Sequence, residues 1–258
     1  MVTRKKLIAA NWKMNLNTHQ ASLYLHKLST LIPVRRNVEV VLAPNMLALQ
    51  SLSIQVDHRQ FKLAAQNCYW RDEGAFTGEV SATQLRGVAQ YVIIGHSERR
   101  HIFHEHDRDV RHKVAAVLRN NMKPILCIGE TAAERADGET FHVIHDQIVS
   151  GLLNVTSEEI KDIVIAYEPV WAIGTGNSAR PEDVQEVVKV IRKQIRALYG
   201  RQAADDVRVL YGGSTTAENA PGYLQVKGVD GFLVGGASLK AKEFASIVQS
   251  AHAKDNDA

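Results

Sequence analysis

Short hydrophobic runs recur along the chain, and longer amphipathic stretches separate them. The runs are rich in β-branched residues and too short for helices, which favours strands. Their hydrophobicity is nearly continuous rather than alternating, which is typical of strands covered on both faces, as in a parallel sheet. Eight such runs occur, at residues 7–12, 38–42, 63–67, 91–94, 124–128, 163–167, 207–211 and 231–234.

The stretches between the runs have the spacing of helices. The clearest is 181–199, which opens on a proline and is expected to end at Gly200. Its apolar stripe consists of Val184, Val187, Val188, Ile191, Ile195 and Leu198. A second helix is expected over 107–121, with Val110, Val114, Val117 and Leu118 on one face. Ser81 and Gln84 have the spacing of a capping box that opens another helix.

The order of these elements predicts the fold. Eight strands that alternate with helices, without a break in composition, predict a single (β/α)8 barrel of eight parallel strands surrounded by helices. One domain over 1–258 is expected, with a frayed polar tail at 254–258. A doubly wound open sheet is the main alternative, and the strand count favours the barrel.

Composition narrows the class of protein. The 258 residues are 45% hydrophobic, enough for a large core, and the net charge is only +3. Lys and Arg are scattered, so no nucleic-acid surface is indicated, although the pI of 8.8 leaves one open. The apolar run at 7–10 is too short for a signal peptide, and no segment approaches a membrane span. Cys68 and Cys127 are expected to be buried free thiols, so we expect a reducing, cytoplasmic location.

Polar or glycine-rich groups follow six of the runs. In a barrel, the carboxyl ends of the strands form the active site. The groups include Asn11 and Lys13 after the first run, Gln66 and Asn67 after the third, His96 after the fourth, Glu168 after the sixth, and Gly212-Gly213 and Gly235-Gly236 after the last two. A purely structural barrel would not need this arrangement.

Three of these side chains are candidates for acid–base chemistry on an anion. Glu168 is either a solvated loop residue or a general base whose pKa is raised by desolvation at the barrel mouth. His96 is either structural or a neutral ring at a helix amino end that donates to a carbonyl oxygen. Lys13 is either an ordinary surface lysine or a compact positive charge facing an anionic substrate.

The glycine pairs after the last two strands lie where barrels commonly bind phosphate with backbone N–H groups, although such pairs also mark ordinary turns. Residues 174–179 fit the G-x-G-x-x-A pattern of dinucleotide sites. We give this match little weight because residues 168–173 separate it from the strand, and a glycine-containing lid fits better. A nicotinamide-dependent oxidoreductase and a non-catalytic phosphate-binding scaffold remain the rival hypotheses.

A histidine cluster follows His96. His101, His104 and His106 do not have the spacing of a known zinc site, and both cysteines lie elsewhere. A charged, exposed turn explains the cluster, so no metal is expected.

Five motifs together resemble the triosephosphate isomerase family. They are NWKMN at 11–15, GHSERR at 95–100, AYEPVWAIGTG at 166–176, YGGS at 211–214 and GGASL at 235–239. The resemblance covers essentially the whole chain in the same order. It implies interconversion of glyceraldehyde 3-phosphate and dihydroxyacetone phosphate through an enediolate, in glycolysis and gluconeogenesis, without a cofactor. This family is a standard example of acid–base tuning and of lid closure.

The resemblance also implies a role for each site residue. Glu168 would remove a proton from the carbon beside the carbonyl and return it to the neighbouring carbon. His96 would polarise the carbonyl and carry protons between the two oxygens. Lys13 would balance the developing negative charge, Asn11 would act as a polar donor, and Glu98 would position Lys13.

The phosphate and the lid complete the implied site. Backbone N–H groups near Gly174, Ser214, Gly235 and Gly236 would hold the phosphate of a small triose substrate. The lid at 169–179 would close over the enediolate and exclude water, which would otherwise favour loss of phosphate.

The resemblance further implies a homodimer. The loop at 66–79 would enter the partner subunit, where Thr77 would brace Asn11 and Lys13 of the other chain. A surface excursion is the alternative. Aromatic side chains such as Phe76 would be costly to leave exposed, which favours an interface.

Three positions depart from the family pattern. Asn177 stands where the end of the lid commonly carries lysine, which leaves the kinetics of the lid open. His104 occupies a usually small position in a turn, and Trp70 is unusual in the interface loop. None of them is the proposed acid or base.

Overall fold

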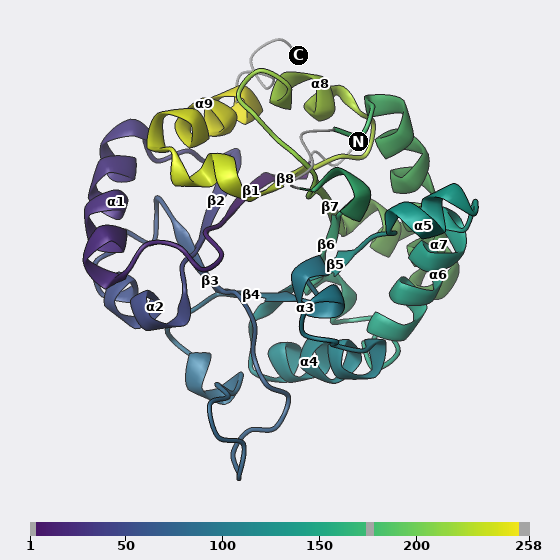
Figure 1. Ribbon diagram of the computed structural model, residues 1–258, viewed down its shortest axis with the longest axis horizontal. Coiled ribbons are helices and arrows are strands. Elements are labelled where there is room, and N and C mark those ends of the chain that lie inside the picture. The colour runs from purple at the N-terminus through teal and green to yellow at the C-terminus, as the bar shows by residue number, and fades with distance from the viewer. Residues whose placement is uncertain (1–3, 174–177, 253–258) are drawn as a thin grey trace.

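The computed structural model describes residues 4–173 and 178–252. Within these residues, eight strands form a closed parallel barrel in sequence order, with helices around it (Figure 1). The strands are β1 (Lys6–Asn11), β2 (Val38–Ala43), β3 (Lys62–Ala65), β4 (Tyr91–Ile94), β5 (Lys123–Ile128), β6 (Val164–Tyr167), β7 (Arg208–Tyr211) and β8 (Gly231–Val234). Pairing of β1 with β8, in which Leu7 lies opposite Gly231, closes the sheet and excludes the open-sheet alternative.

The helices of the described residues lie outside the barrel wall (Figure 1). The α-helices are α1 (Thr18–Leu31), α2 (Met46–Ser53), α3 (Ser97–His101), α4 (Asp107–Arg119), α5 (Ala132–Ala136), α6 (Thr140–Gly151), α7 (Pro181–Asp206), α8 (Ala220–Gln225) and α9 (Ala241–His252). Short 3-10 turns are η1 (Thr83–Leu85), η2 (Ile160–Asp162), η3 (Val170–Ala172) and η4 (Gly236–Leu239). All eight predicted strands are confirmed, with ends that differ by at most two residues.

The predicted helices need two corrections. Gly200 does break α7, with φ +88°, but the chain then resumes a helical path to Asp206. Leu198, predicted on the buried stripe, is 46% exposed and lies two residues before this break. Ser81 and Gln84 make both capping hydrogen bonds, yet they open only the three-residue turn η1.

The barrel interior is filled by alternate strand residues, because successive side chains of a strand point to opposite faces. They are Leu7, Ala9, Val41, Ala43, Ala64, Tyr91, Ile93, Ile125, Cys127, Val164, Ala166, Leu210 and Leu233. Continuing the alternation toward the mouth leads to Asn11 after Ala9 and to Glu168 after Ala166. The equivalent next positions on four other strands are Gly95, Gly129, Gly212 and Gly235. On β2 and β3 the next positions are Asn45 and Gln66, so four strands end in polar residues and the glycines of the other four leave space between them.

Other predictions concern isolated features. Cys68 and Cys127 are free and buried, as expected. Among the described residues, no group of three or more His, Cys, Asp or Glu side chains could hold a metal ion. In the same part of the chain, no helix has both the length and the hydropathy that crossing a membrane requires. The tail predicted at 254–258 lies outside the described residues.

The loop between β3 and η1 projects away from the barrel, at the bottom of Figure 1. A bridge between Tyr69 and Ser81 closes its base. The Tyr69 ring stacks on Trp70 at 4.1 Å between centroids and lies 4.5 Å from the ring of Phe76. Phe76 nevertheless remains 37% exposed.

Candidate active site

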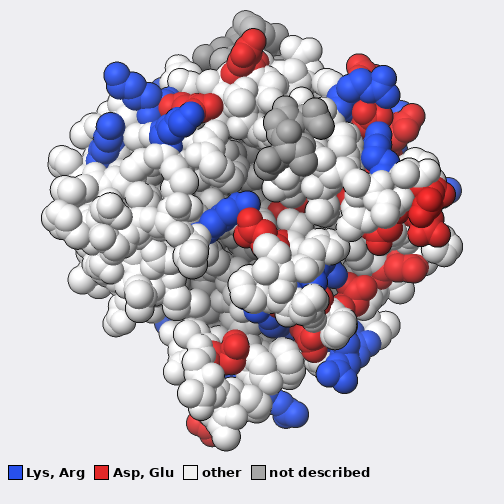
Figure 2. Space-filling view, in the orientation of Figure 1, with Lys and Arg blue, Asp and Glu red and all other residues white. Residues whose placement is uncertain are grey.

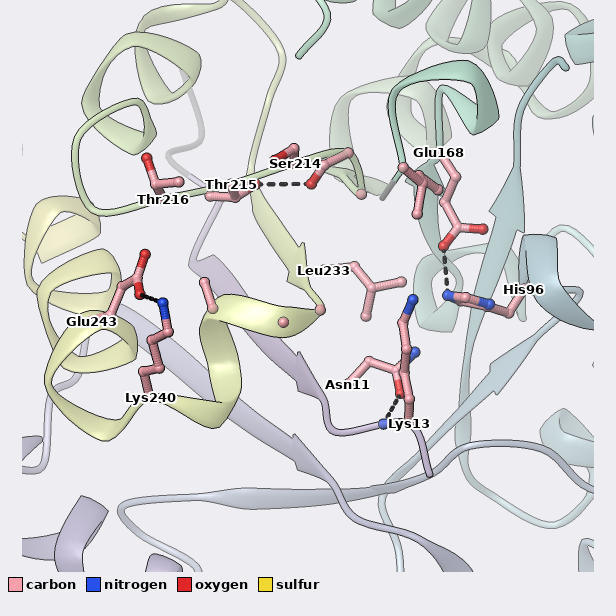
Figure 3. Close-up of a pocket in the computed structure, with 16 residues that line it drawn as sticks. Asn11, Lys13, His96, Glu168, Ser214, Thr215, Thr216, Leu233, Lys240 and Glu243 are labelled. Atoms are coloured by element: carbon pink, nitrogen blue, oxygen red, sulfur yellow. Dashed lines mark hydrogen bonds and ion pairs between the residues drawn. The ribbon is translucent and has the colours of Figure 1, made fainter. Parts of the chain in front are cut away.

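A cavity of about 350 Å³ opens at the carboxyl ends of the strands. Figure 2 shows the hollow near the centre of this face, and Figure 3 shows the side chains that turn into it. The lining residues that the sequence singled out are Asn11, Lys13, His96, Glu168, Gly212, Gly213, Ser214, Gly235 and Gly236. Thr77 lies instead in the projecting loop, and Gly174 lies outside the described residues. Five separate strand ends, those of β1, β4, β6, β7 and β8, thus contribute to one small space.

Glu168 and His96 meet in this cavity (Figure 3). Oε1 of Glu168 lies 3.0 Å from Nε2 of His96, and the carboxylate is only 2% exposed. Its other oxygen, Oε2, accepts a hydrogen bond of 2.9 Å from the Ser97 amide at the start of α3. The Glu168 amide in turn donates to Ile128 O on β5, at 2.7 Å, which fixes the backbone that carries the carboxylate.

The hydrogen bonds of His96 fix its tautomer. His96 is the N-cap of α3, and its Nδ1 accepts the amide hydrogen of Glu98 at 3.2 Å. A backbone amide can only donate, so Nδ1 carries no proton and Nε2 carries the hydrogen that points at Glu168. We therefore assign a neutral ring with its donor directed into the cavity, as the helix amino end predicts.

The pKa of Glu168 is lowered, whereas burial alone would raise it. Burial raises this pKa, but the neighbouring His96, the Ser97 amide and Lys13 together outweigh it and hold the carboxyl below its usual value. Burial lowers the pKa of His96, and the Glu168 carboxylate reverses that direction. Protonating His96 would still displace the Glu98 amide from Nδ1, so the site rests as a carboxylate beside a neutral imidazole.

Lys13 is held over the cavity in an uncommon backbone conformation. Its φ is +51°, in the left-handed region, and its amide donates to the Asn11 side chain at 3.0 Å. Gln66 donates to Lys13 O at 2.9 Å from the end of β3. The ammonium lies 2.5 Å from Oε1 of Glu98, which is itself outside the cavity lining. The sequence places Gln66 at a strand end but does not predict its contact with Lys13.

The glycines on the far side of the cavity are required by close packing. A Cβ on Gly212 would lie 2.9 Å from Cγ of Glu168, and one on Gly213 would lie 2.3 Å from the Tyr211 hydroxyl. At Gly236, by contrast, a Cβ would meet open space. The first pair therefore leaves room for Glu168 and Tyr211, whereas Gly236 keeps backbone accessible to a ligand.

Comparison with known proteins matches this site to one family. A sequence model described as "Triosephosphate isomerase" matches residues 6–251. A triosephosphate isomerase of Chloroherpeton thalassium is 45% identical over 250 residues, covering 96% of this chain and 99% of that protein. The triosephosphate isomerase of Geotalea uraniireducens is 44% identical and covers 95% of this chain and 98% of its own length. That of Streptococcus suis is 41% identical and covers 96% of this chain and 99% of its own length. The chain belongs to the triosephosphate isomerase family.

Membership of the triosephosphate isomerase family argues against the oxidoreductase reading of residues 174–179. Positions 174–177, including the departure at Asn177, lie outside the described residues. His104, the second departure from the family pattern, adopts φ +55°, in the left-handed region that favours glycine but in which histidine is also found. Trp70, the third, packs on Tyr69 at the base of the projecting loop.

The first part of the lid, up to residue 173, is hydrogen-bonded to a buried carboxylate that the sequence did not identify. Glu130 has no exposed surface and accepts hydrogen bonds from Tyr167 at 3.1 Å and from the Trp171 indole at 2.9 Å. Arg135 lies 3.4 Å away and stacks over the Trp171 ring at 4.3 Å. On the other side of the lid, Ala179 accepts a hydrogen bond from Tyr223. A polar residue just after the fifth strand was the available signal for Glu130.

Other lining residues were also missed. They are Thr215, Thr216, Leu233, Lys240 and Glu243, whereas Ile173 and Ala237, which also line the cavity, belong to the predicted lid and to the GGASL motif. Leu233 is the last interior residue of β8 and forms apolar floor, while Lys240 and Glu243 pair at 3.5 Å near the rim (Figure 3). Hydrophobic patterning assigns Leu233 to the core and cannot show that the core ends there.

Proposed function

We propose that this site interconverts glyceraldehyde 3-phosphate and dihydroxyacetone phosphate by proton transfer through an enediolate, the reaction of glycolysis and gluconeogenesis. The observation that carries the proposal is the ionised carboxylate of Glu168, 3.0 Å from the neutral donor of His96 in one cavity. Membership of the triosephosphate isomerase family supports it.

Glu168 acts as the base in this proposal. Its lowered pKa keeps it ionised at neutral pH, and its contact with His96 is exchanged for the substrate when the triose phosphate enters. The carboxylate takes the proton from the carbon beside the carbonyl and returns it to the neighbouring carbon. Side chains perform both transfers, so no cofactor is required.

His96 and Lys13 act on the substrate oxygens. The Nε2 hydrogen of His96 is donated to the carbonyl oxygen, and the ring then carries protons between the two oxygens. The Glu98 amide on Nδ1 keeps the resting ring neutral, so the ring becomes an imidazolate when it gives up the Nε2 hydrogen and is neutral again when it takes a proton from the other oxygen. Lys13 balances the negative charge of the enediolate and phosphate, and Asn11 supplies a further donor.

The phosphate lies at the other end of the cavity in this proposal. Backbone N–H groups near Ser214, Gly235 and Gly236 bind it, together with Gly174 from the lid, and η4 begins at Gly236. Closure of the lid excludes water and protects the enediolate from losing phosphate.

Replacing Glu168 by aspartate tests the base. The shorter side chain withdraws the carboxylate by about one methylene, and misplacement of this size costs on the order of 100-fold in rate. We expect kcat in a coupled isomerase assay to fall by at least that factor with the fold intact. Glu186→Asp, on the exposed face of α7, is the matched control and should be unchanged. Unimpaired turnover of Glu168→Asp would remove Glu168 from its role.

We also propose that the active form is a homodimer. The loop carrying Thr77 projects from the barrel, and Met14 and Leu47 near the same face are 95% and 87% exposed. Figure 2 shows hardly any charged side chains over α2, so this surface is largely uncharged and carries exposed apolar side chains. Entry of the loop into a partner would cover it and would brace Asn11 and Lys13 of the partner with Thr77.

Gel filtration coupled to light scattering tests the dimer. We expect twice the chain mass of 28.6 kDa, and a Thr77→Arg variant that shifts toward the single-chain mass and loses isomerase activity. An active protein of single-chain mass would contradict the proposal.

A further inference from the structure

A second cavity, of about 550 Å³, lies beside the barrel wall at the end remote from the active site. It is formed by the second half of α7 and the segment that leads into β7, so it faces the amino ends of the strands. Five of its seven lining residues are cationic. They are Lys189, Arg192, Lys193, Arg196 and Arg201, with Ala204 and Asp205 completing the lining. We call this the basic pocket.

Helical geometry concentrates these charges. Positions 189, 192, 193 and 196 fall on one face of α7 and span about 10 Å along its axis. Like charges at these spacings cost a helix a few tenths of a kcal/mol per pair, so helix stability does not explain the stripe. The break at Gly200 then turns the chain, and Arg201 and Asp205 complete the pocket from the second arm of the helix.

Arg192 forms the rigid back of the basic pocket. Its Nη1 donates to Ala204 O at 2.6 Å and to Val207 O at 3.2 Å, and its Nη2 donates to Gly228 O at 2.6 Å and to Asp230 at 2.8 Å. Its Nε is buried without a hydrogen-bond partner in the part of the chain that the structure describes. The guanidinium is therefore fixed in place with one donor left over.

The basic pocket has too few counter-charges. Asp230 binds Arg192 and also Arg4, at 2.7 Å, so one carboxylate serves two guanidiniums. Asp205 lies 3.7 Å from Arg201. Within residues 4–173 and 178–252, no carboxylate comes within 4.0 Å of the other three cations, Lys189, Lys193 and Arg196. The net charge of the whole chain is only +3, so this excess of positive charge is local.

We propose that the basic pocket binds a small multivalent anion carrying at least two phosphate groups. Arg side chains bind phosphate through paired N–H donors and Lys binds it as a point charge, and the pocket offers both along about 10 Å. A nucleic acid would need cations over a longer track, since such complexes neutralise roughly 6–10 phosphates. The size of the pocket therefore favours the small anion.

Calorimetric titration with inorganic tripolyphosphate tests the proposal on the full-length protein. Saturating dihydroxyacetone phosphate is present to occupy the active site. We expect one tripolyphosphate per chain and an affinity that falls about tenfold or more in Lys193→Gln/Arg196→Gln, because charge-assisted contacts are lost. Both residues are exposed, and Gln is as good a helix former as Lys or Arg, so the variant should fold and keep its isomerase activity.

The matched control is Lys27→Gln/Lys242→Gln, which removes the same charge from exposed positions of α1 and α9. It should bind tripolyphosphate as the unaltered protein does. An equal loss in both double variants would indicate unspecific attraction and overturn the proposal, as would undiminished binding to Lys193→Gln/Arg196→Gln. Tighter binding of a duplex oligonucleotide through the same residues would overturn the assignment to a small anion.

Discussion

Gly129 tests the idea that the backbone position of the base controls catalysis. Gly129 follows β5 directly, beside the strand end that carries Glu168. A Cβ added there would lie 1.7 Å from the carbonyl oxygen of Glu168 and 2.6 Å from its carbonyl carbon. Ordinary contact begins at about 3.4 Å, so the Glu168 backbone has to move by roughly 1.7 Å in Gly129→Ala.

That displacement sets the expected magnitude. Misplacing a catalytic group by about 1 Å costs on the order of 100-fold in rate, so kcat of Gly129→Ala should fall by at least that factor. Overpacking of this kind costs about 1–3 kcal/mol, which a domain with a stability of about 5–15 kcal/mol survives. The variant should therefore be folded but slow.

A coupled isomerase assay, alongside thermal unfolding followed by circular dichroism, separates these two effects. Gly222→Ala is the matched control, because a Cβ there meets nothing within 4 Å, and both its activity and its stability should be preserved. A folded Gly129→Ala protein with kcat within threefold of the unaltered protein would refute the link between the position of this backbone and the rate.

Three further predictions follow from contacts in the site and the core. His96→Gln should lower kcat by about 100-fold while leaving inhibition by inorganic phosphate largely intact in steady-state assays; loss of phosphate affinity with normal turnover would contradict the roles proposed. Asp230→Asn should lower the free energy of unfolding in urea by about 3 kcal/mol, because it leaves two guanidiniums without their shared carboxylate; a change below 1 kcal/mol would show that they find other partners. Burial raises the pKa of Glu39, but Arg208 and Tyr91 outweigh burial and lower this pKa below its ordinary value of 4.5. The ionised Glu39 therefore stabilises the folded protein fully above pH 4.5, and this stabilisation is lost as the pH falls through the pKa of Glu39 in the folded state. The unaltered protein should be more stable than Glu39→Gln in urea unfolding at pH 7, and this difference should be smaller at pH 4. A difference that is larger at pH 4 would mean that the pKa of Glu39 is raised, not lowered, in the folded protein.

The barrel could be predicted because its strands carry their signal locally. Each strand is buried on both faces, so its hydrophobicity is nearly continuous and marks its own position. The second arm of α7 could not be predicted in this way. Gly200 correctly predicts a break in the helix. Only the structure shows that the chain resumes a helical path after Gly200 and that Leu198 is exposed.

Site residues that directly follow a strand could be predicted from the sequence. Properties that depend on contacts between residues far apart in the chain could not. Asn11 and Glu168 follow from the alternation of interior residues and from the family motifs. The direction of the Glu168 pKa depends on His96, which comes from another strand end, and burial alone gave the wrong sign. Glu130 was missed because its partners Tyr167 and Trp171 lie 37 and 41 residues further along the chain.

Proton exchange at the substrate carbon tests the role of Glu168 most directly. Dihydroxyacetone phosphate is incubated with the protein in D2O, and deuterium at the carbon beside the carbonyl is followed by proton NMR, with Glu168→Gln for comparison. We expect the unaltered protein to incorporate deuterium during turnover, and Glu168→Gln to fold but to incorporate it on the order of 1,000-fold more slowly. Undiminished incorporation by Glu168→Gln would mean that another group removes the proton.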